Sequence, residues 1–220
     1  MSRKITDIIF DLDGTLIDSA PSILECFKLA LEENGISSLV PMDSSLIGPP
    51  LLETLKLLTG HSDLQILNKL SSDFKAHYDS SGYKSTVVFL GVAELLKSIS
   101  ANGFDLHIAT NKRLKPTTLI LEYFELADYF KSIYALDSKN PSYTNKSEML
   151  AGLIEDQGIN NKSAVYVGDR AEDLTSALEN DMKFIGASWG YRDSKLHARS
   201  DIILCGEVNL MPRYLNEGIV

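Results

Sequence analysis

The sequence of 220 residues contains only two cysteines, Cys26 and Cys205. They lie far apart in unlike surroundings, so their spacing predicts neither a zinc site nor a disulfide framework. Reduced thiols are typical of proteins that remain in a reducing compartment. We therefore expect a cytoplasmic protein.

Long apolar runs are also missing. No stretch approaches the roughly 18 consecutive apolar residues that a membrane span needs. The apolar run near the N-terminus contains Asp7 and Asp11, which the hydrophobic region of a signal peptide would not tolerate. We expect neither a membrane span nor an export signal.

Positive charge is scarce. The formal net charge is −9, and Lys and Arg are scattered along the chain instead of gathered in runs. This charge balance argues against binding to nucleic acid or to an anionic membrane surface. An anionic substrate would need a locally positive site, such as a metal ion beside a lysine.

The composition is that of a globular protein, with 44% hydrophobic and 23% charged residues. From residue 87 onward, apolar β-rich runs alternate with segments of helical spacing, which is the pattern of an α/β fold. Most of the runs are uniformly apolar, as parallel strands between two layers of helices are. We predict strands at residues 5–11, 104–110, 132–136, 164–168, 183–187 and 202–205, and helices at 92–101, 116–126, 146–157 and 171–180.

The segment of residues 16–86 differs from the remainder. Its apolar residues follow helical spacing throughout, and it contains no convincing strand. Turn-forming residues flank it, with Gly14 near its start and Ser80-Ser81-Gly82 near its end. We predict a core domain of residues 1–15 and 87–220, with a helical domain of residues 16–86 inserted after the first strand.

The first predicted strand ends in two carboxylates, Asp11 and Asp13, followed by Gly14. Residues two apart lie on the same side of an extended chain, and open α/β sheets bind ligands at the carboxyl ends of their strands. A solvated acidic turn and a calcium loop are the alternatives. The calcium loop fails on spacing, because its sixth position is Leu16 instead of glycine and its twelfth is Ser22 instead of glutamate.

At these residues the sequence resembles the haloacid dehalogenase superfamily, whose first motif is Asp-x-Asp-Gly-Thr after an apolar strand. The other motifs follow in order: a threonine that ends an apolar strand, a lysine that opens a helix, and Gly-Asp with another Asp four residues later. They fall on Thr110, Lys146, Asp169 and Asp173. Taken alone, a strand-ending threonine, a surface lysine and an acidic helix start are all common. Many relatives have proline after the lysine, where this chain has Ser147, and Lys139 is the alternative lysine.

The resemblance covers the whole chain, and Trp189-Gly190-Tyr191 is similar to the phosphoglycolate-phosphatase-like branch. It implies a doubly wound, Rossmann-like parallel sheet with an inserted α-helical cap. It also implies a hydrolase that acts on a small-molecule phosphate ester and requires Mg²⁺.

The resemblance implies a role for each matching residue. Asp11 would be the nucleophile and Asp13 the general acid and base, while Thr110 and Lys146, with the neighbouring Asn111, would bind the phosphoryl group. Mg²⁺ would be held by Asp11, the backbone carbonyl of Asp13 and Asp169. Asp173 would either bind the metal through water or orient Lys146.

The second acid of the first motif narrows the reaction, because a halide leaving group needs no proton and relatives that cleave carbon–halogen bonds lack this acid. Asp13 therefore favours phosphate chemistry. A phosphoglycolate-like monoester is the first candidate substrate; a nucleotide 5′-phosphatase, a pyrophosphatase and a sugar phosphomutase are alternatives. A non-catalytic binding or regulatory protein of the same fold is the alternative from another class.

Selectivity should come from the helical segment, because the motif residues would contact only the phosphoryl group. The loop of residues 47–52, with Gly48, Leu51 and Leu52, is the segment most expected to face the site. A rigid turn without substrate contact is the alternative. Lys112, Arg113 and Tyr143 are further candidates on the rim of the core.

Overall fold

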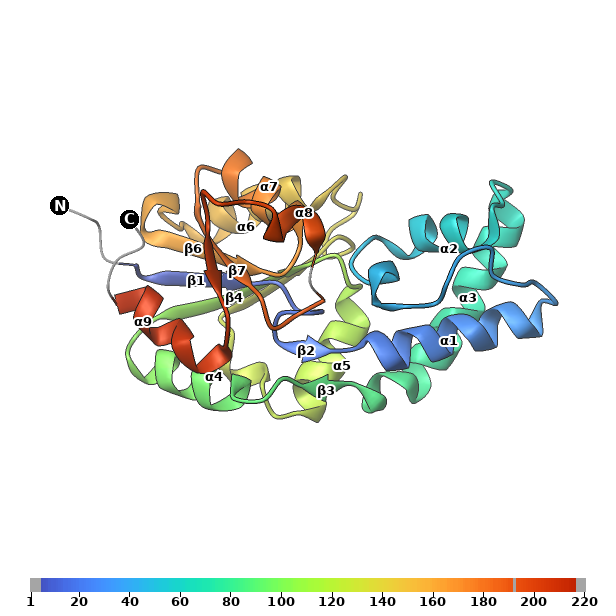
Figure 1. The fold of residues 1–220 in the computed structure, drawn as a ribbon, viewed down its shortest axis with the longest axis horizontal. Helices are drawn as coiled ribbons and strands as arrows, with labels where there is room; N and C mark the ends of the chain where they lie inside the picture. Colours follow the sequence, from blue (N-terminus) through green and yellow to red (C-terminus); the bar gives the residue numbers. More distant parts are fainter. Residues whose placement is uncertain (1–4, 192, 217–220) are drawn as a thin grey trace.

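The computed structural model describes residues 5–191 and 193–216 (Figure 1). At its centre lies a six-stranded sheet in the order β5-β4-β1-β6-β7-β8, in which all neighbouring strands are parallel. The α/β fold with a doubly wound parallel sheet is confirmed. Every predicted strand is present, with ends that differ from the prediction by at most two residues: β1 (Asp7–Phe10), β4 (Asp105–Thr110), β5 (Ser132–Ala135), β6 (Ala164–Gly168), β7 (Lys183–Ala187) and β8 (Ile203–Cys205).

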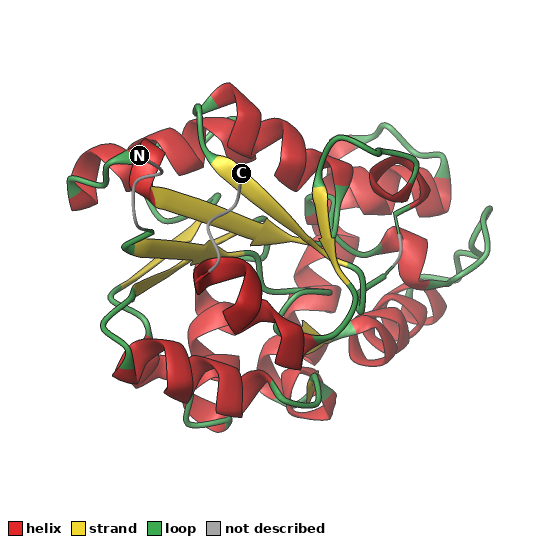
Figure 2. Cartoon of the chain, turned by 60° about the vertical axis from the view of Figure 1, so that its left-hand side comes forward, coloured by secondary structure: helices red, strands yellow, loops and turns green. Residues whose placement is uncertain are grey.

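Helices cover both faces of this sheet (Figure 2). One face carries α6 (Lys146–Gln157), α7 (Ala171–Glu179) and the short α8 (Ser194–His197). The other face carries α4 (Val92–Ala101), α5 (Leu114–Tyr123) and α9 (Met211–Asn216). The pattern of the sequence identified α4, α6 and α7 but neither α8 nor α9, which are too short to show a helical period.

Alternate residues of each central strand enter two separate hydrophobic clusters. Ile8 and Phe10 of β1 join the larger cluster with Leu96 of α4, whereas Ile9 joins the second cluster with Leu150 of α6. This division follows from the two-residue side-chain period of a strand. Because both faces are buried, the strands are apolar at almost every position.

The helix predicted at residues 116–126 is α5, which begins and ends earlier. It begins at Leu114, whose backbone N–H donates to Asp137 Oδ1 at 2.7 Å, so that Pro116 lies within the first turn. It ends at Tyr123 because the chain soon leaves helical geometry, with a φ of 57° at Glu125.

The helices within residues 16–86 lie together at one end of the sheet (Figure 1). α1 (Ala20–Glu33) packs against α3 (Leu64–Ser80), which in turn packs against α2 (Leu51–Thr59). The rings of Phe27 and Phe74 lie 4.5 Å apart between α1 and α3. None of the described helices is long and apolar enough to cross a membrane.

One prediction about this segment is wrong. It does contain a strand, β2 (Ile17–Asp18), which pairs antiparallel with β3 (Val87–Val88). Two residues are too few to show a strand period in the sequence. The pairing brings the two ends of the helical segment side by side, so the chain leaves the sheet and returns to it at neighbouring points.

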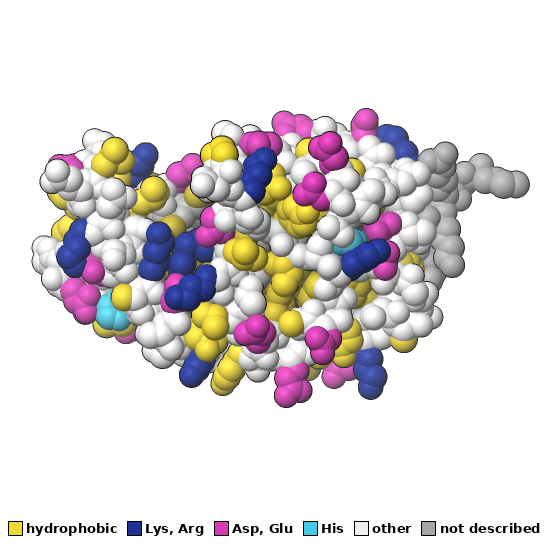
Figure 3. Space-filling view, turned by 180° about the vertical axis from the view of Figure 1, so that it is seen from behind, with side chains coloured by type: hydrophobic (Ala, Val, Ile, Leu, Met, Phe, Trp, Pro, Cys, Tyr) yellow, Lys and Arg dark blue, Asp and Glu magenta, His cyan; other side chains and the backbone are white. Residues whose placement is uncertain are grey.

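Charge is unevenly distributed over the surface. On the face seen in Figure 3, Lys and Arg side chains group over the helical end of the molecule and its boundary with the sheet. The chain as a whole has a net charge of −9. Asp and Glu side chains lie among the Lys and Arg side chains on the same face.

Candidate active site

The site lies at the carboxyl edge of the sheet, where the strand order reverses. From β1 the chain builds the sheet outward through β4 and β5, then returns to place β6 on the other side of β1. In such sheets the crevice for a ligand opens at this switch point. Asp11 follows β1, Asp169 follows β6 and Thr110 ends β4, so the three predicted residues lie at this edge.

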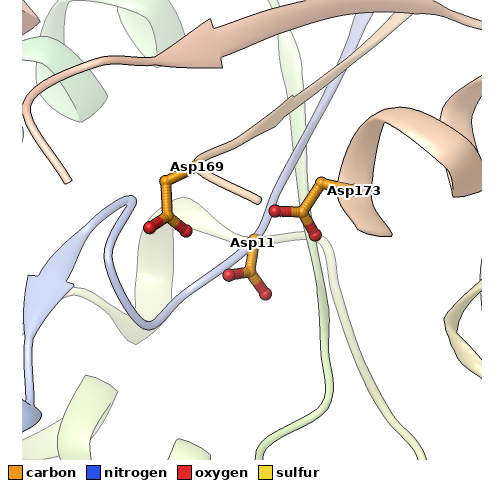
Figure 4. A group of neighbouring side chains, drawn as sticks. All are labelled: Asp11, Asp169 and Asp173. Atoms are coloured by element: carbon orange, nitrogen blue, oxygen red, sulfur yellow. The ribbon is translucent and has the colours of Figure 1, made fainter. Parts of the chain in front are cut away.

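Three carboxylates gather at the switch point (Figure 4). Asp11, Asp169 and Asp173 are all buried, and each contributes an oxygen that lies within 4.8 Å of the others. Asp169 Oδ1 has no hydrogen-bond partner. An unpartnered buried oxygen is costly, so its presence here requires an explanation.

The loops after β1 and β7 close over Asp169, and glycine makes this possible. Gly14 has a φ of 88°, and a Cβ there would lie 2.3 Å from Asp169 Oδ2. A Cβ on Gly190 would lie 2.0 Å from the carbonyl oxygen of Gly14. The backbone N–H of Tyr191 donates to Asp169 Oδ2 at 3.0 Å. The Trp189-Gly190-Tyr191 sequence thus holds Asp169 in place.

Lys146 is the first residue of α6, and Asn145 caps this helix by accepting from the N–H of Glu148 at 2.8 Å. The Lys146 ammonium donates to Asp11 Oδ1 at 2.9 Å and to Asp173 Oδ1 at 2.6 Å. Asp173 thus contacts Lys146 and also belongs to the carboxylate cluster, so both of its predicted roles stay open. The alternative lysine, Lys139, is exposed, and its Nζ lies 3.2 Å from Glu148 Oε1, outside the carboxylate cluster.

Burial dominates the electrostatics of the cluster. It raises the pKa of Asp11 to about 7, although Lys146 opposes the shift. It also raises the pKa of Asp169 well above its usual range, with Asp173 and Asp11 adding to the effect. Burial alone would lower the pKa of Lys146, but Asp11 and Asp173 together raise it well above its usual value. Arg170 Nε also lies 3.8 Å from Asp169 Oδ2, so two cationic side chains, Lys146 and Arg170, face three carboxylates and leave negative charge in excess.

A divalent metal ion fits this arrangement. Hard cations such as Mg²⁺ prefer carboxylate oxygens, and the cluster offers carboxylates from Asp11, Asp169 and Asp173. The unpartnered Asp169 Oδ1 is an available ligand atom. A cation would also favour the ionised form of each acid. These residues could hold a metal ion.

Asp13 lies beside this cluster and has its own partners. The Lys112 ammonium donates to both of its carboxylate oxygens, at 3.0 and 3.1 Å, and the Ser19 hydroxyl donates to Oδ1. The ammonium also lies 4.7 Å from the ring centre of Tyr78, a residue of α3. The sequence suggested Lys112 only for the rim, whereas the structure pairs it with the second acid of the first motif.

The loops after β4 and β6 contact the helical segment. Asn111 Nδ2 donates to the carbonyl of Gly48 at 3.0 Å, and Arg170 donates to the carbonyls of Ser44 and Ile47 at 2.9 and 2.5 Å. Thr110 Oγ1 accepts from the N–H of Lys112 at 3.2 Å and so braces the same loop. The segment around Gly48 therefore faces the carboxyl edge of the sheet.

Residues 8–187 match the family model described as haloacid dehalogenase-like hydrolase. The chain belongs to this family. It is 28% identical over 215 residues to a 5′-nucleotidase of Pseudomonas aeruginosa, with 96% of each chain covered. It is 29% identical over 195 residues to a phosphoglycolate phosphatase of Cereibacter sphaeroides, covering 86% of this chain and 88% of the relative.

A kinase and a solved structure are also similar to this chain. The haloacid dehalogenase-like chain is 32% identical over 188 residues to tyrosine-protein kinase PtkA of Mycobacterium tuberculosis, covering 84% of this chain and 62% of the kinase. A solved structure of a predicted phosphatase from Clostridium acetobutylicum superposes with a TM-score of 0.84 at 30% identity, covering 98% of this chain and all of that one. The fold is thus shared along almost the full chain. The names of the relatives describe different activities, those of a nucleotidase, a phosphatase and a kinase.

A cavity opens between the helical segment and the sheet of this hydrolase. Asp13, Gly48, Leu51 and Asn111 line it, together with apolar side chains of α1 and α3. Leu52, which was predicted beside Leu51, is outside the lining and 39% exposed. A helix turns consecutive side chains by about 100°, so neighbours at the start of α2 point in different directions.

Tyr143 is not on the rim, contrary to the prediction. It is buried in the second hydrophobic cluster, and a Cβ on Gly152 would lie 2.7 Å from its hydroxyl. Its ring stands under Lys139, 3.8 Å from the ammonium. Burial of its aromatic ring contributes to the packing of this hydrophobic cluster. It therefore supports α6 instead of facing a substrate.

We predict that Mg²⁺ stabilises the folded protein through Asp169. At a hundredfold excess over its dissociation constant, a ligand of the folded state adds about 2.7 kcal/mol of stability. Asp169→Asn should remove most of this gain, yet be no less stable than the unsubstituted protein without metal, because one buried charge is lost. Thermal unfolding with and without Mg²⁺ measures both effects.

Asp201→Asn is the matched control, since Asp201 is exposed and pairs with Arg199. It should retain the full Mg²⁺ effect. An undiminished rise in the unfolding temperature of Asp169→Asn would remove Asp169 from the metal site.

Proposed function

We propose that this chain is a Mg²⁺-dependent phosphatase that hydrolyses a small phosphomonoester through an aspartyl-phosphate on Asp11. The observation that supports this most directly is the position of two acids that lie two residues apart. Asp11 lies in the buried carboxylate cluster, and Asp13 lines the cavity. A phosphoryl group at Asp11 would have its leaving group at Asp13. The phosphatases among the relatives agree with this reading.

In the first step, a carboxylate oxygen of Asp11 attacks phosphorus, and the bond from phosphorus to the ester oxygen breaks. Asp13 gives its proton to the departing oxygen. Lys146, which lies 2.9 Å from Asp11, and Thr110 at the end of β4 would bind the phosphoryl oxygens. The products of this step are the free alcohol and a phosphorylated Asp11.

In the second step, Asp13 takes a proton from a water molecule that attacks the phosphorus of the aspartyl-phosphate. The bond to Asp11 breaks, which restores its carboxylate and the proton on Asp13 and releases inorganic phosphate. When bound by Asp11, Asp169 and the carbonyl of Asp13, Mg²⁺ would supply positive charge for the phosphoryl oxygens. Asp173 would hold Lys146 in position through their 2.6 Å contact.

The helical segment, residues 16–86, would act as a cap domain over the core of residues 1–15 and 87–220. The contacts of Asn111 and Arg170 to its backbone close the cavity from one side. Such a cap excludes water from the first step and opens to exchange substrate and product. The names of the relatives suggest phosphoglycolate and nucleoside 5′-monophosphates as the substrates to test first.

Phosphate release from a panel of phosphoglycolate, sugar phosphates, nucleotides and pyrophosphate, with Mg²⁺ and with excess EDTA, tests the proposed function. We expect release only with the metal, and we expect Asp11→Asn to lower it to the background level while the variant stays folded, because an amide is close in shape but not nucleophilic. Substantial turnover by Asp11→Asn would exclude the covalent mechanism. Transfer of phosphate within one sugar without release would identify a mutase.

For Asp13→Asn we predict an effect that depends on the leaving group. Phosphorylation of Asp11 by alkyl esters should slow by about 100-fold or more, the range for loss of a general acid. Aryl esters of acidic phenols should be slowed less, because their leaving groups depart without a proton. Rapid-quench measurement of the phosphoenzyme separates this step from its hydrolysis, and equal losses for both ester types would show that Asp13 is not the acid.

Leu51→Ala should change the ranking of substrates, because Leu51 lines the cavity. Leu52→Ala is the control, since Leu52 is the next residue of α2 but lies outside the lining. We expect the ratios of kcat/KM between substrates to change several-fold in Leu51→Ala only. A change of this size is typical of the loss of one or two buried methyl groups from a binding pocket. Equal rankings in both folded variants would place selectivity elsewhere.

A further inference from the structure

The cavity between the helical segment and the sheet has walls that are mainly apolar. Ile23 and Phe27 of α1, Leu51 of α2 and Phe74 of α3 all contribute to it. The space between these walls amounts to about 530 Å³, part of which is open to solvent. There is room for an organic group beyond the phosphoryl group.

The positive charges that line the cavity already have carboxylate partners. Among the described lining residues, only Lys112 and Arg113 are cationic. Lys112 pairs with both oxygens of Asp13, and Arg113 donates to the two oxygens of Asp79 at 3.1 and 2.5 Å. The second pair is bidentate and largely buried, which is the strong geometry for an arginine–carboxylate contact. A second anionic group entering the cavity would have to break one of these pairs.

One neutral hydrogen-bonding atom in the same walls is without a partner, the buried carbonyl oxygen of the Asn111 side chain. Buried polar atoms are normally satisfied, so a ligand that supplies its partner would remove a cost. A hydroxyl or amide group meets this need without introducing charge.

We propose that the cavity takes an uncharged leaving group with an apolar body, and that it selects against phosphate esters that carry a carboxylate. The inference rests on the proposed phosphatase function and names its substrate class. The phosphoryl group supplies the only anionic part that the site accommodates. Neutral alcohols are therefore favoured over a hydroxy acid such as glycolate.

Two substrates that differ only at the end of the leaving group provide the test. Phosphoglycolate and isobutyl phosphate have the same linkage, but isobutyl phosphate has an uncharged isopropyl group where phosphoglycolate has a carboxylate. With Mg²⁺, kcat/KM for isobutyl phosphate should be higher by about tenfold or more, since a charged group buried without a partner costs at least that much. Benzyl phosphate should also exceed phosphoglycolate.

A charge variant tests the cause. Asp79→Asn leaves Arg113 without its carboxylate partner, so it should raise kcat/KM for phosphoglycolate relative to isobutyl phosphate several-fold. Asp73→Asn is the matched control, because Asp73 also lies on α3 and pairs with Lys69 away from the cavity. This control should leave the ratio unchanged.

The outcomes separate the two proposals. Mg²⁺-dependent turnover with phosphoglycolate preferred would overturn the inference about charge and leave the phosphatase function in place. An unchanged ratio in folded Asp79→Asn would show that the Arg113–Asp79 pair does not exclude carboxylates, which also overturns it. Absence of turnover with every ester would overturn the proposed function and this inference together.

Discussion

The constraint on which the site depends is the concentration of buried negative charge at the ends of β1 and β6. Asp11, Asp169 and Asp173 share a small volume with one ammonium, that of Lys146. Such a cluster opposes folding unless its charges are balanced, because burial and mutual repulsion both disfavour the ionised acids. The apolar strands and helices around it must offset this cost. A metal ion bound by these carboxylates would balance the remaining negative charge and would place positive charge beside a phosphoryl group.

The same edge of the sheet also controls the contact with the helical segment. Asn111 follows β4 and Arg170 follows β6, and both donate to backbone carbonyls of the loop around Gly48. Arg113 pairs with Asp79 across the same boundary. Every one of these contacts begins within a few residues of a strand end. The contacts of the helical segment with the sheet therefore depend on the positions of the loops that form the site.

The sequence was sufficient for features that are local in the chain. Apolar runs located the strands, and the acids of the first and fourth motifs lie where strand ends must bring them. It was insufficient for pairs that only tertiary packing creates. Lys112 and Asp13 are 99 residues apart, and Arg113 and Asp79 are 34 apart, so no period or spacing connects them. The prediction for Tyr143 was wrong for a related reason. An aromatic ring with a polar hydroxyl is equally suited to the rim of a site and to a hydrophobic core.

Asp13 joins the charge cluster to the cavity, and its partners explain why leaving-group charge matters. Both of its oxygens accept from Lys112, and one also accepts from Ser19, which is the arrangement of a base. To donate a proton, Asp13 must exchange one of these contacts for the ester oxygen. A neutral leaving group can make this exchange while Lys112 remains over the ring of Tyr78. A carboxylate would instead compete with Asp13 for the Lys112 ammonium, so it would disturb the residue on which proton transfer depends.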